Sequence, residues 1–365
     1  MKKISLLTLI ILFSLIFVTC EQDEFRSFKD YDYTTVYFPY QYPVRTLILG
    51  NYPLADNTRD NELKFLISAR MGGVYRNNSD VEVRYQIDES LVDNLQTNPN
   101  QWDGKTVTTP DTLAVLPSRY YSLGAPENTI IIPKGSYHGG VEVQLIQDFL
   151  DDPKAWTTHY VIPLRITSTT ADSVLSGKTT IPNADPRVLK DWEIAPKDFT
   201  IFGIKFINPY HGKYFHKGKS AISVEGSSVT QTIYYSAVSR ITGNPTLELN
   251  EIWSLQTTGR NRVTVTGRLQ DPLATPGEFK INIDFNESGD CTVSDADDSL
   301  FPVTGSGKFV ENADTWGGKP RDAIYLNYMV TNGEYTSTIT DTLVLRDKGI
   351  SFQQFSPEFV VEELD

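Results

Sequence analysis

The chain has 365 residues, a formal net charge of −13 at pH 7, 12% aromatic residues and two cysteines. Such an acidic surface repels nucleic acid and anionic lipid, so we exclude both as partners. Beyond the first twenty residues only Cys291 carries a thiol, so an internal disulfide is excluded and a hydrophobic core must supply the stability. The length is sufficient for two or three domains.

The first twenty residues have the pattern of a secretion signal. Two lysines precede an apolar run over residues 4–18, which is too short to span a bilayer comfortably. The run ends at Phe17-Val18-Thr19-Cys20, which resembles a bacterial lipobox, in which the cysteine becomes the lipidated first residue of the mature chain. We therefore predict a lipoprotein signal peptide over residues 1–19 and lipidation of Cys20. The alternative is an ordinary secretory peptide with an incidental cysteine.

An acidic tether is predicted over residues 20–30. It includes Glu21-Gln22-Asp23-Glu24, which resembles the export signal that Bacteroidota lipoproteins carry just after the lipidated cysteine. The resemblance implies a protein that is anchored in the outer membrane by lipid and faces the cell exterior. A solvated acidic segment without a signal function is the alternative. Removal of the two lysines with the signal peptide takes the net charge from −13 to −15.

Residues 31–184 predict a β-sandwich. Short runs rich in β-branched and aromatic residues alternate with turn residues, at the spacing typical of an antiparallel sandwich. The predicted strands are TTVYFPY (34–40), KFLISARM (64–71), VEVRYQI (81–87), TIIIPKG (129–135), GVEVQLI (140–146) and YVIPLRIT (160–167).

A connector is predicted over residues 185–205. Asp185 and Pro186 stand where a brief helix places its N-cap and first helical residue. Trp192 follows this helix and is expected to pack between the two domains.

Residues 206–361 predict an antiparallel β-barrel. In EFKINIDF (278–285) apolar and polar residues alternate, so this strand has one buried and one exposed face. Asn332-Gly333 lies between two alternating runs and is a strong hairpin signal. The segment contains about eight to ten such strands in sequence, and closure into a barrel removes their exposed edges.

Several stretches resemble a known pair of domains. YTTVYFPYQYPVRTLILG, IIPKGSYHGGVEVQL and YVIPLRITSTTADSVLSGK are similar to an N-terminal domain of unknown function in SusE-like and related surface glycan-binding lipoproteins of Bacteroidota. The tail from KINIDFNESGDCTV to TDTLVLRDKGISFQQFSPEF resembles the C-terminal domain paired with it. Gly212-Lys213-Tyr214 and Arg346 occupy the places of a lipocalin Gly-x-Trp motif and of the arginine that packs on it. The resemblance implies an all-β chain, with an immunoglobulin-like β-sandwich followed by a lipocalin-like barrel.

The sequence offers few residue groups that suggest catalysis. The four histidines are scattered, and His211 and His216 would point to opposite faces of one strand, so we interpret all four as structural. We predict neither a metal site nor a cofactor. The segment DADDS (295–299) has the spacing of a calcium loop without its glycine and glutamate, and is interpreted as a solvated acidic loop. A glycosidase carboxylate pair stays open, because the sequence does not give the separation of two carboxyl groups.

Three tryptophans in polar, turn-rich stretches are candidate carbohydrate-binding residues: Trp102, Trp156 and Trp316. A tryptophan in a solvated loop must cover its apolar face, either with a sugar ring or with its own domain. Trp316 is the preferred candidate, because Gly317-Gly318 lets a ligand approach closely. The polar residues expected to assist it are Asp314, Lys319 and Arg321. Trp253 lies in an alternating run and is expected in the core.

Four sites with the sequence Asp-Ser/Thr-apolar resemble the O-glycosylation sequon of exported Bacteroidota proteins. Ser173, Ser299 and Thr112 are the candidate acceptors, the first two in predicted loops. Thr342 is expected in the middle of a strand, where modification is disfavoured.

Together these features predict a non-catalytic surface lipoprotein that binds a polysaccharide or oligosaccharide for a glycan-uptake system. The expected partners are the glycan, an outer-membrane importer with its lipoprotein partner, and the outer membrane through the lipid anchor. The alternatives are a lipocalin-like carrier of a small apolar ligand and a structural or adhesive surface protein; a glycosidase ranks last. An open apolar cavity in the barrel would favour the carrier, whereas a filled barrel would exclude it.

Overall fold

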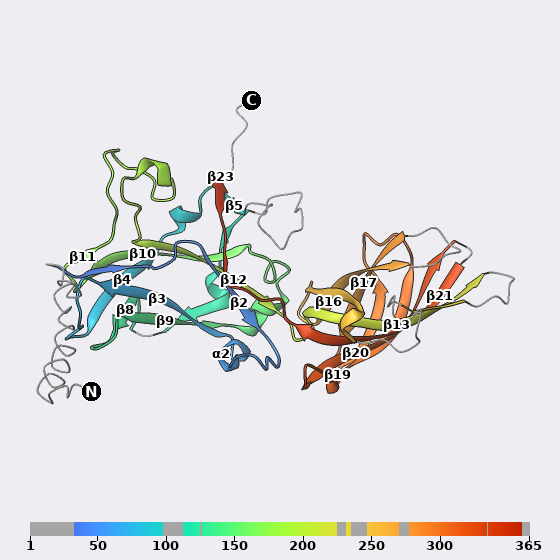
Figure 1. Ribbon diagram of the computed structural model, residues 1–365. Helices are drawn as coiled ribbons and strands as arrows, with labels where there is room; N and C mark the ends of the chain where they lie inside the picture. The colour runs from blue at the N-terminus through green and yellow to red at the C-terminus, as the bar shows by residue number, and fades with distance from the viewer. Residues whose placement is uncertain are drawn as a thin grey trace, which may run out of the picture.

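The computed structural model describes residues 33–97, 112–124, 126–224, 231–234, 247–269, 277–333 and 335–359. They form two β units placed end to end, an N-terminal β-sandwich and a C-terminal β-barrel (Figure 1). The predicted all-β fold class is therefore confirmed. Within the described ranges, no helix is long and apolar enough to cross a membrane.

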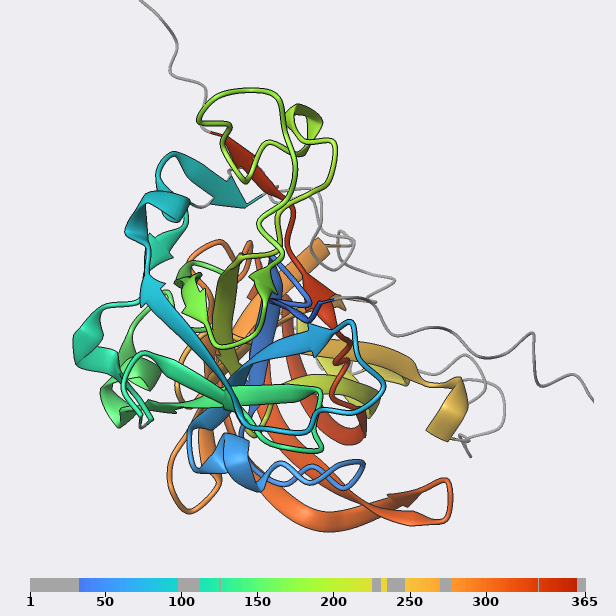
Figure 2. The ribbon, with the colours of Figure 1, turned by 90° about the vertical axis from the view of Figure 1, so that its left-hand side faces the viewer.

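The sandwich has two curved sheets, which lie in front of the barrel in Figure 2. The first sheet has the strand order β11 (Ser173–Val174), β1 (Thr35–Tyr37), β3 (Lys64–Gly72), β9 (His138–Leu145), β7 (Tyr121–Leu123). The second has the order β22 (Gln353–Gln354), β2 (Pro43–Ile48), β12 (Phe199–Ile207), β10 (Tyr160–Thr169), β4 (Val81–Ile87), β8 (Thr129–Ile132), with β6 (Ala114–Val115) paired to β10. All six strands predicted for this segment are present. The sequence did not predict the other strands of the two sheets, which are β2, β6, β7, β11, β12 and β22.

Short elements complete the unit. They are α2 (Thr58–Asn61), the 3-10 turns η3 (Glu89–Val92), η5 (Ser118–Tyr120), η6 (Gln147–Asp151) and η7 (Leu189–Asp191), and a ribbon of β5 (Leu95–Thr97) with β23 (Pro357–Phe359). In β3, Phe65, Ile67, Ala69 and Met71 are buried while the residues between them are not, which is the pattern of a strand with one face on the core. Buried residues of both sheets form one hydrophobic cluster between them, and Val44, Val161, Phe199 and Ile201 of the second sheet belong to another cluster.

The barrel is a meander closed on itself. Its strands are β13 (Gly212–Val224), β14 (Gln231–Tyr234), β15 (Glu251–Thr257), β16 (Arg262–Leu269), β17 (Gly277–Phe285), β18 (Asp290–Asp295), β19 (Val303–Trp316), β20 (Lys319–Asn332) and β21 (Tyr335–Asp347), with η8 (Leu247–Leu249) before β15. β13 pairs with β21 along its length, so all of these strands except β14 form a closed ring. β20 and β21 form the hairpin predicted from Asn332-Gly333, and β17 has the predicted alternation of buried residues.

The predicted connector differs from the structure. Residues 199–207 form β12, which lies between β10 and β2 inside the second sheet of the sandwich. Nearly every residue of β12 is buried, because the strand is central in its sheet and both of its faces are covered. The sandwich therefore extends to Ile207, and the crossing to the barrel is the short segment 208–211. The helix expected near Asp185 is reduced to the single turn η7.

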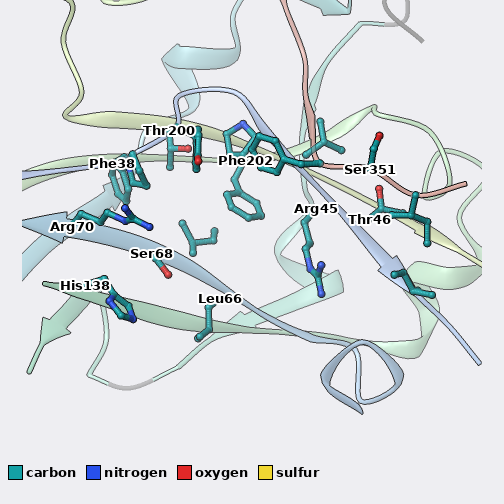
Figure 3. Close-up of a pocket in the computed structure, with 18 of the residues that line it drawn as sticks. Phe38, Arg45, Thr46, Leu66, Ser68, Arg70, His138, Thr200, Phe202 and Ser351 are labelled. Carbon is teal, nitrogen blue, oxygen red and sulfur yellow. The ribbon is translucent and has the colours of Figure 1, made fainter. Parts of the chain in front are cut away.

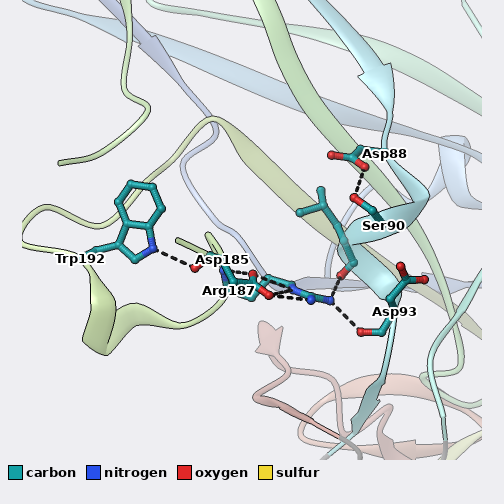
Figure 4. Close-up of polar contacts among 7 residues, drawn as sticks. Asp88, Ser90, Asp93, Asp185, Arg187 and Trp192 are labelled. Carbon is teal, nitrogen blue, oxygen red and sulfur yellow. Dashed lines mark hydrogen bonds and ion pairs between the residues drawn. The ribbon is translucent and has the colours of Figure 1, made fainter. Parts of the chain in front are cut away.

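Residues 175–198 connect β11 to β12, and Arg187 binds this segment to the sandwich (Figure 4). Its guanidinium binds both carboxylate oxygens of Asp185 and donates to the carbonyl oxygens of Leu91 and Asp93 at 3.1 and 2.8 Å. The indole of Trp192 donates to the carbonyl oxygen of Asp185 at 2.8 Å. Trp192 therefore packs within this segment, and the prediction that it lies between the domains is wrong.

After the barrel, the chain returns along the sandwich (Figure 1). The sequence had predicted instead that the barrel continues to residue 361. Lys348 is buried and donates to the carbonyl oxygen of Pro209, and burial lowers its pKa to about 8. β22 then pairs with β2, Phe355 is buried against Tyr42, and β23 pairs with β5. We call residues 348–359 the return segment.

The two units meet through buried polar contacts. The side-chain amide of Asn208, which is fully buried, donates to the carbonyl oxygens of Gly259 and Arg262 at 3.0 and 2.8 Å. Nδ1 of His211 accepts the backbone N–H of Thr257 at 3.1 Å. Burial and two nearby lysine charges lower the pKa of His211 to about 3, so this ring is neutral. His211 is structural, as predicted.

Candidate functional site

An open pocket of about 610 Å³ lies in the seam between the two sheets of the sandwich (Figure 3). Its walls come from β2 and β12 of one sheet, from β3 and β9 of the other, and from the return segment. The pocket therefore combines residues that are far apart in the sequence, including a segment that follows the barrel. It is the candidate functional site of this chain.

The seam opens because the chain changes sheets next to β3. β1 pairs with β3 only as far as Tyr37 opposite Arg70, and the chain then crosses to the other sheet and starts β2 at Pro43. Pro39 and Pro43 lack a backbone N–H, so neither can donate to a strand ladder, and they flank the crossing. The residues of β3 before Arg70 consequently have no β1 partner, and the pocket forms in the space left beside them.

Aromatic rings make up part of the pocket lining. Tyr40 is 45% exposed and Phe352, from the return segment, is 66% exposed, and their ring centroids lie 5.1 Å apart. Tyr52 is half-buried at the rim, and Phe38 and Phe202 contribute to the floor. Large apolar side chains with this exposure are available to stack on a ligand ring.

Polar side chains also line the pocket. Ser68 and Arg70 project from β3, and His138 stands opposite Arg70 in the register of β3 and β9. Arg45 is held by an ion pair with Asp60, whose second oxygen accepts the backbone N–H of Ile48 at 3.0 Å. The pocket therefore offers both apolar rings and hydrogen-bonding groups to a ligand.

Thr200 adds a buried hydroxyl to the floor of the pocket. Its side chain is 1% exposed, and its Oγ1 has no hydrogen-bond partner among the described residues. A buried polar atom without a partner is unfavourable, so a ligand or water that bonds this hydroxyl would be stabilised here.

The hairpin around Trp316 brings together the residues predicted from the sequence, but it is not a free loop. Trp316 ends β19, and a two-residue turn of Gly317 and Gly318, both with positive φ, leads into β20. The ring of Trp316 lies 5.0 Å from that of Phe215, and the guanidinium of Arg321 lies 5.0 Å from its centroid. Trp316 is half-buried by these contacts, so it has the features of a hairpin anchor.

The other residues of this group are placed accordingly. Asp314 forms an ion pair with Lys217 at 2.6 Å, which lowers the pKa of Asp314 against the opposing effect of partial burial. Lys319 is exposed opposite Trp316 in the hairpin.

The remaining tryptophans divide between structural positions and undescribed ones. Trp253 is buried in the barrel, as predicted. Trp156 is half-buried and packs edge-on against Phe206, with 6.4 Å between ring centroids. Its apolar face is therefore covered by its own domain, which is the alternative to sugar binding. Trp102 and the lipidation candidate Cys20 lie outside the described residues.

The O-glycosylation candidates have different environments. Ser173 lies in β11, where its hydroxyl bonds Thr35 Oγ1 at 2.8 Å, so the prediction that it is in a loop is wrong. The short strand forms because the carboxylate of Asp172 accepts both the backbone N–H and the hydroxyl of Thr34. Ser299 is in a loop, as predicted, and Thr112 is exposed.

A buried polar cluster lies inside the barrel. His216 Nε2 is 2.9 Å from Asp341 Oδ2, the same oxygen accepts the hydroxyl of Tyr328 at 2.7 Å, and Trp253 lies against the imidazole. Burial alone would lower the pKa of His216, but Asp341 and Glu251 raise it to about 9. The described buried hydrophobic residues of the barrel strands, Trp253 and Tyr328 among them, form one cluster.

A second hollow of about 380 Å³ lies on the outer wall of the barrel. Both of its basic groups are paired, Arg262 with Asp284 at 2.7 Å and Lys280 with Asp298 at 2.6 Å. No aromatic residue is among its described lining. In the part of the chain that the structure describes, no group of three or more His, Cys, Asp or Glu could hold a metal ion.

The sequence contains a signal for the pocket in tyrosine and phenylalanine residues rather than in the tryptophans. Tyr40 lies in FPYQYP and Phe352 in GISFQQF, and both stretches place aromatic residues among turn-forming or polar ones. Extending the argument for solvated tryptophans to Tyr and Phe would have selected these two residues. Their proximity depends on the return segment, which no local pattern indicates.

Two family models match the chain. One, with the description "-like, N-terminal domain", matches residues 31–173, and the other, Domain of unknown function (DUF5627), matches residues 209–349. The first match ends within the sandwich and the second covers the barrel strands. No curated protein matches the chain.

Two solved structures from Bacteroides ovatus are similar. One is a structural genomics protein of unknown function, with 35% identity and a TM-score of 0.79 over 90% of this chain and 100% of that chain. The other is a multidomain protein including DUF1735, with 12% identity and a TM-score of 0.40 over 86% of this chain and 94% of that chain. The second likeness is too low to carry an argument. Because the first protein is 35% identical to this chain over the whole of its own length, the chain belongs to the same family of two-unit β proteins of unknown function.

Proposed function

We propose that this protein is a cell-surface lipoprotein that binds a polysaccharide without cleaving it, and that the pocket in the sandwich seam is the binding site. The observation that carries the proposal is the position of the exposed rings of Tyr40 and Phe352 beside Ser68, Arg70 and His138 in one open pocket. Sugar rings stack on aromatic faces through their C–H surfaces, while their hydroxyl groups need hydrogen-bonding partners.

Two further observations support binding without catalysis or transport. A typical glycosidase needs two carboxyl groups beside the scissile bond, and the described residues that line the pocket include neither Asp nor Glu. The buried His216–Asp341 pair makes the barrel interior partly polar, which favours a glycan binder over a carrier of an apolar ligand inside the barrel.

The proposed location is the outer face of the outer membrane, with Cys20 lipidated and residues 21–24 acting as an export signal. The glycan would be held near an outer-membrane importer and its lipoprotein partner, as in the SusE-like systems that the sequence resembles. This part of the proposal rests on the sequence, since residues 1–32 lie outside the described ranges.

Calorimetric titration with a panel of polysaccharides tests the binding site. We expect Tyr40→Ala and Phe352→Ala each to weaken binding about fivefold to 150-fold, by analogy with the loss of a stacked base. Tyr325→Ala is the matched control, because this tyrosine is exposed on the barrel and should leave the affinity unchanged.

Trp316→Ala separates the pocket from the hairpin that the sequence favoured. With Trp316 packed on Phe215, we expect this variant to melt at a lower temperature and to bind glycan normally. A loss of affinity in Trp316→Ala, with Tyr40→Ala and Phe352→Ala binding as the wild type does, would move the site to the hairpin. A wild-type protein that binds no polysaccharide of the panel would contradict the proposed function.

A further inference from the structure

The lining of the pocket has the opposite charge to the protein as a whole. The chain carries a net charge of −13, yet the pocket is lined by the basic residues Arg45, Arg70 and His138, and none of the described lining residues is Asp or Glu. A neutral sugar can hydrogen-bond these groups but gains nothing from their charge, whereas an anionic ligand is attracted to a local positive potential.

Arg70 carries the uncompensated charge. Its side chain is exposed on β3, and no hydrogen bond or ion pair joins this side chain to another described residue. Arg45 differs, because Asp60 neutralises it. The nearest acidic side chain on the facing strand β9, Glu142, lies opposite Leu66 and is 3.9 Å from Arg59.

The position of His138 strengthens this reading. It is directly opposite Arg70 in the register of β3 and β9, so both side chains leave the same face of the sheet, and Figure 3 shows them beside the same space. Two basic residues directly opposite each other in a sheet are unfavourable when both are charged. An anion between them removes that cost and uses the fork of guanidinium donors.

We propose that the pocket selects an anionic glycan, one whose sugars carry carboxylate or sulfate groups, and that Arg70 binds the anionic group. Tyr40 and Phe352 contact the ring, His138 assists Arg70, and the unpaired hydroxyl of Thr200 is a further polar contact at the floor. This inference rests on the proposed function and names the class of its ligand.

The test is calorimetric titration of the purified protein with polygalacturonate and with its carboxyl-reduced counterpart, which has the same linkage without charge; chondroitin sulfate supplies the sulfated case. We expect an anionic polymer to bind at least tenfold more tightly than the neutral one, with an affinity that falls as salt is raised. Arg70→Gln should weaken anionic binding about tenfold or more, since hydrogen bonds to charged groups are the strong ones. Its melting temperature should be unchanged, because Arg70 is exposed.

Arg268→Gln is the control for charge alone, because Arg268 is an exposed arginine of the barrel. Equal losses in Arg70→Gln and Arg268→Gln would indicate unspecific attraction and overturn the assignment to Arg70. Equal binding of charged and neutral polymers, unaffected by Arg70→Gln, would overturn the anionic ligand while leaving the proposed glycan binding intact. If no polymer of either kind binds, both the inference and the proposed function fail.

Discussion

At the scale of single residues, the buried His216–Asp341 pair is important for the stability of the barrel. Asp341 is fully buried inside the barrel, and a side chain on Gly218 would meet its Oδ1 at 2.1 Å, so the carboxylate occupies the space that this glycine leaves. Buried charges are stable only when they are paired, so each partner depends on the other.

Asp341→Asn should lower the free energy of unfolding by about 3–5 kcal/mol at pH 6, because it removes the partner of a buried charge. The folded protein raises the pKa of His216 from about 6.5 to about 9, so the pair stabilises fully below pH 6.5 and its contribution is lost as the pH rises through 9. The difference between wild type and variant should therefore shrink from pH 6.5 to 9, as measured by urea unfolding.

Tyr328→Phe is the companion variant. It removes one hydrogen bond to Asp341 and keeps the ion pair, so the free energy of unfolding should fall by about 1–3 kcal/mol with the pH dependence retained. A difference between wild type and Asp341→Asn that stays constant across the window would show that His216 is not charged in the folded barrel.

At the scale of elements, the return segment has two phenylalanines with different roles. Phe355 is 3% exposed and packs with Tyr42 and Phe199, whereas Phe352 is 66% exposed at the pocket. β22 and β23 pair with the sandwich over only a few residues, so side-chain burial must supply most of the stability of this attachment. The pocket wall formed by residues 350–352 therefore depends on Phe355.

Phe355→Ala should cost about 3–5 kcal/mol of stability, as for other buried phenylalanines, and should expose the return segment to limited proteolysis. Glycan binding should weaken as well, because Phe352 loses its fixed position. Phe352→Ala, on the same element, should weaken binding with little change in melting temperature or protease sensitivity. Equal melting temperatures for the two variants would contradict this division of roles.

At the scale of the whole molecule, the acidic surface, the predicted anchor and the pocket in the sandwich form one hypothesis of a surface binder. The pocket lies in the unit that follows the predicted tether directly, whereas the barrel is the second unit along the chain. The barrel contributes to the site through the chain that leaves it, since residues 350–352 line the pocket.

Cys20→Ala should release the protein from the membrane or stall its processing, because the proposed acyl chains are attached there. Proteinase K added to intact cells should degrade the wild-type protein while a periplasmic marker in the same cells stays intact. Unchanged membrane attachment of Cys20→Ala would refute lipidation, and survival of the wild-type protein until the outer membrane is broken would refute surface exposure.

The sequence by itself determined the fold class, most of the strands and the burial of Trp253 in the core. Alternation along EFKINIDF and the Asn332-Gly333 signal are local, and local patterns report which face of a strand is buried. The same reasoning failed for β12, because a central strand buried on both faces has no alternation. It also failed for Trp316, whose partner Phe215 is a hundred residues earlier in the chain and reaches it only in the closed barrel.

Only the tertiary structure decided where the candidate site lies. Tyr40, Arg70, His138 and Phe352 come from four separate segments, and no local pattern indicates that these segments meet. They meet because the chain changes sheets after the three residues of β1, and because the return segment pairs with β2. Pairing between strands distant in sequence depends on the energy of the whole fold, so a site assembled by such pairing is not encoded in any single stretch of the chain.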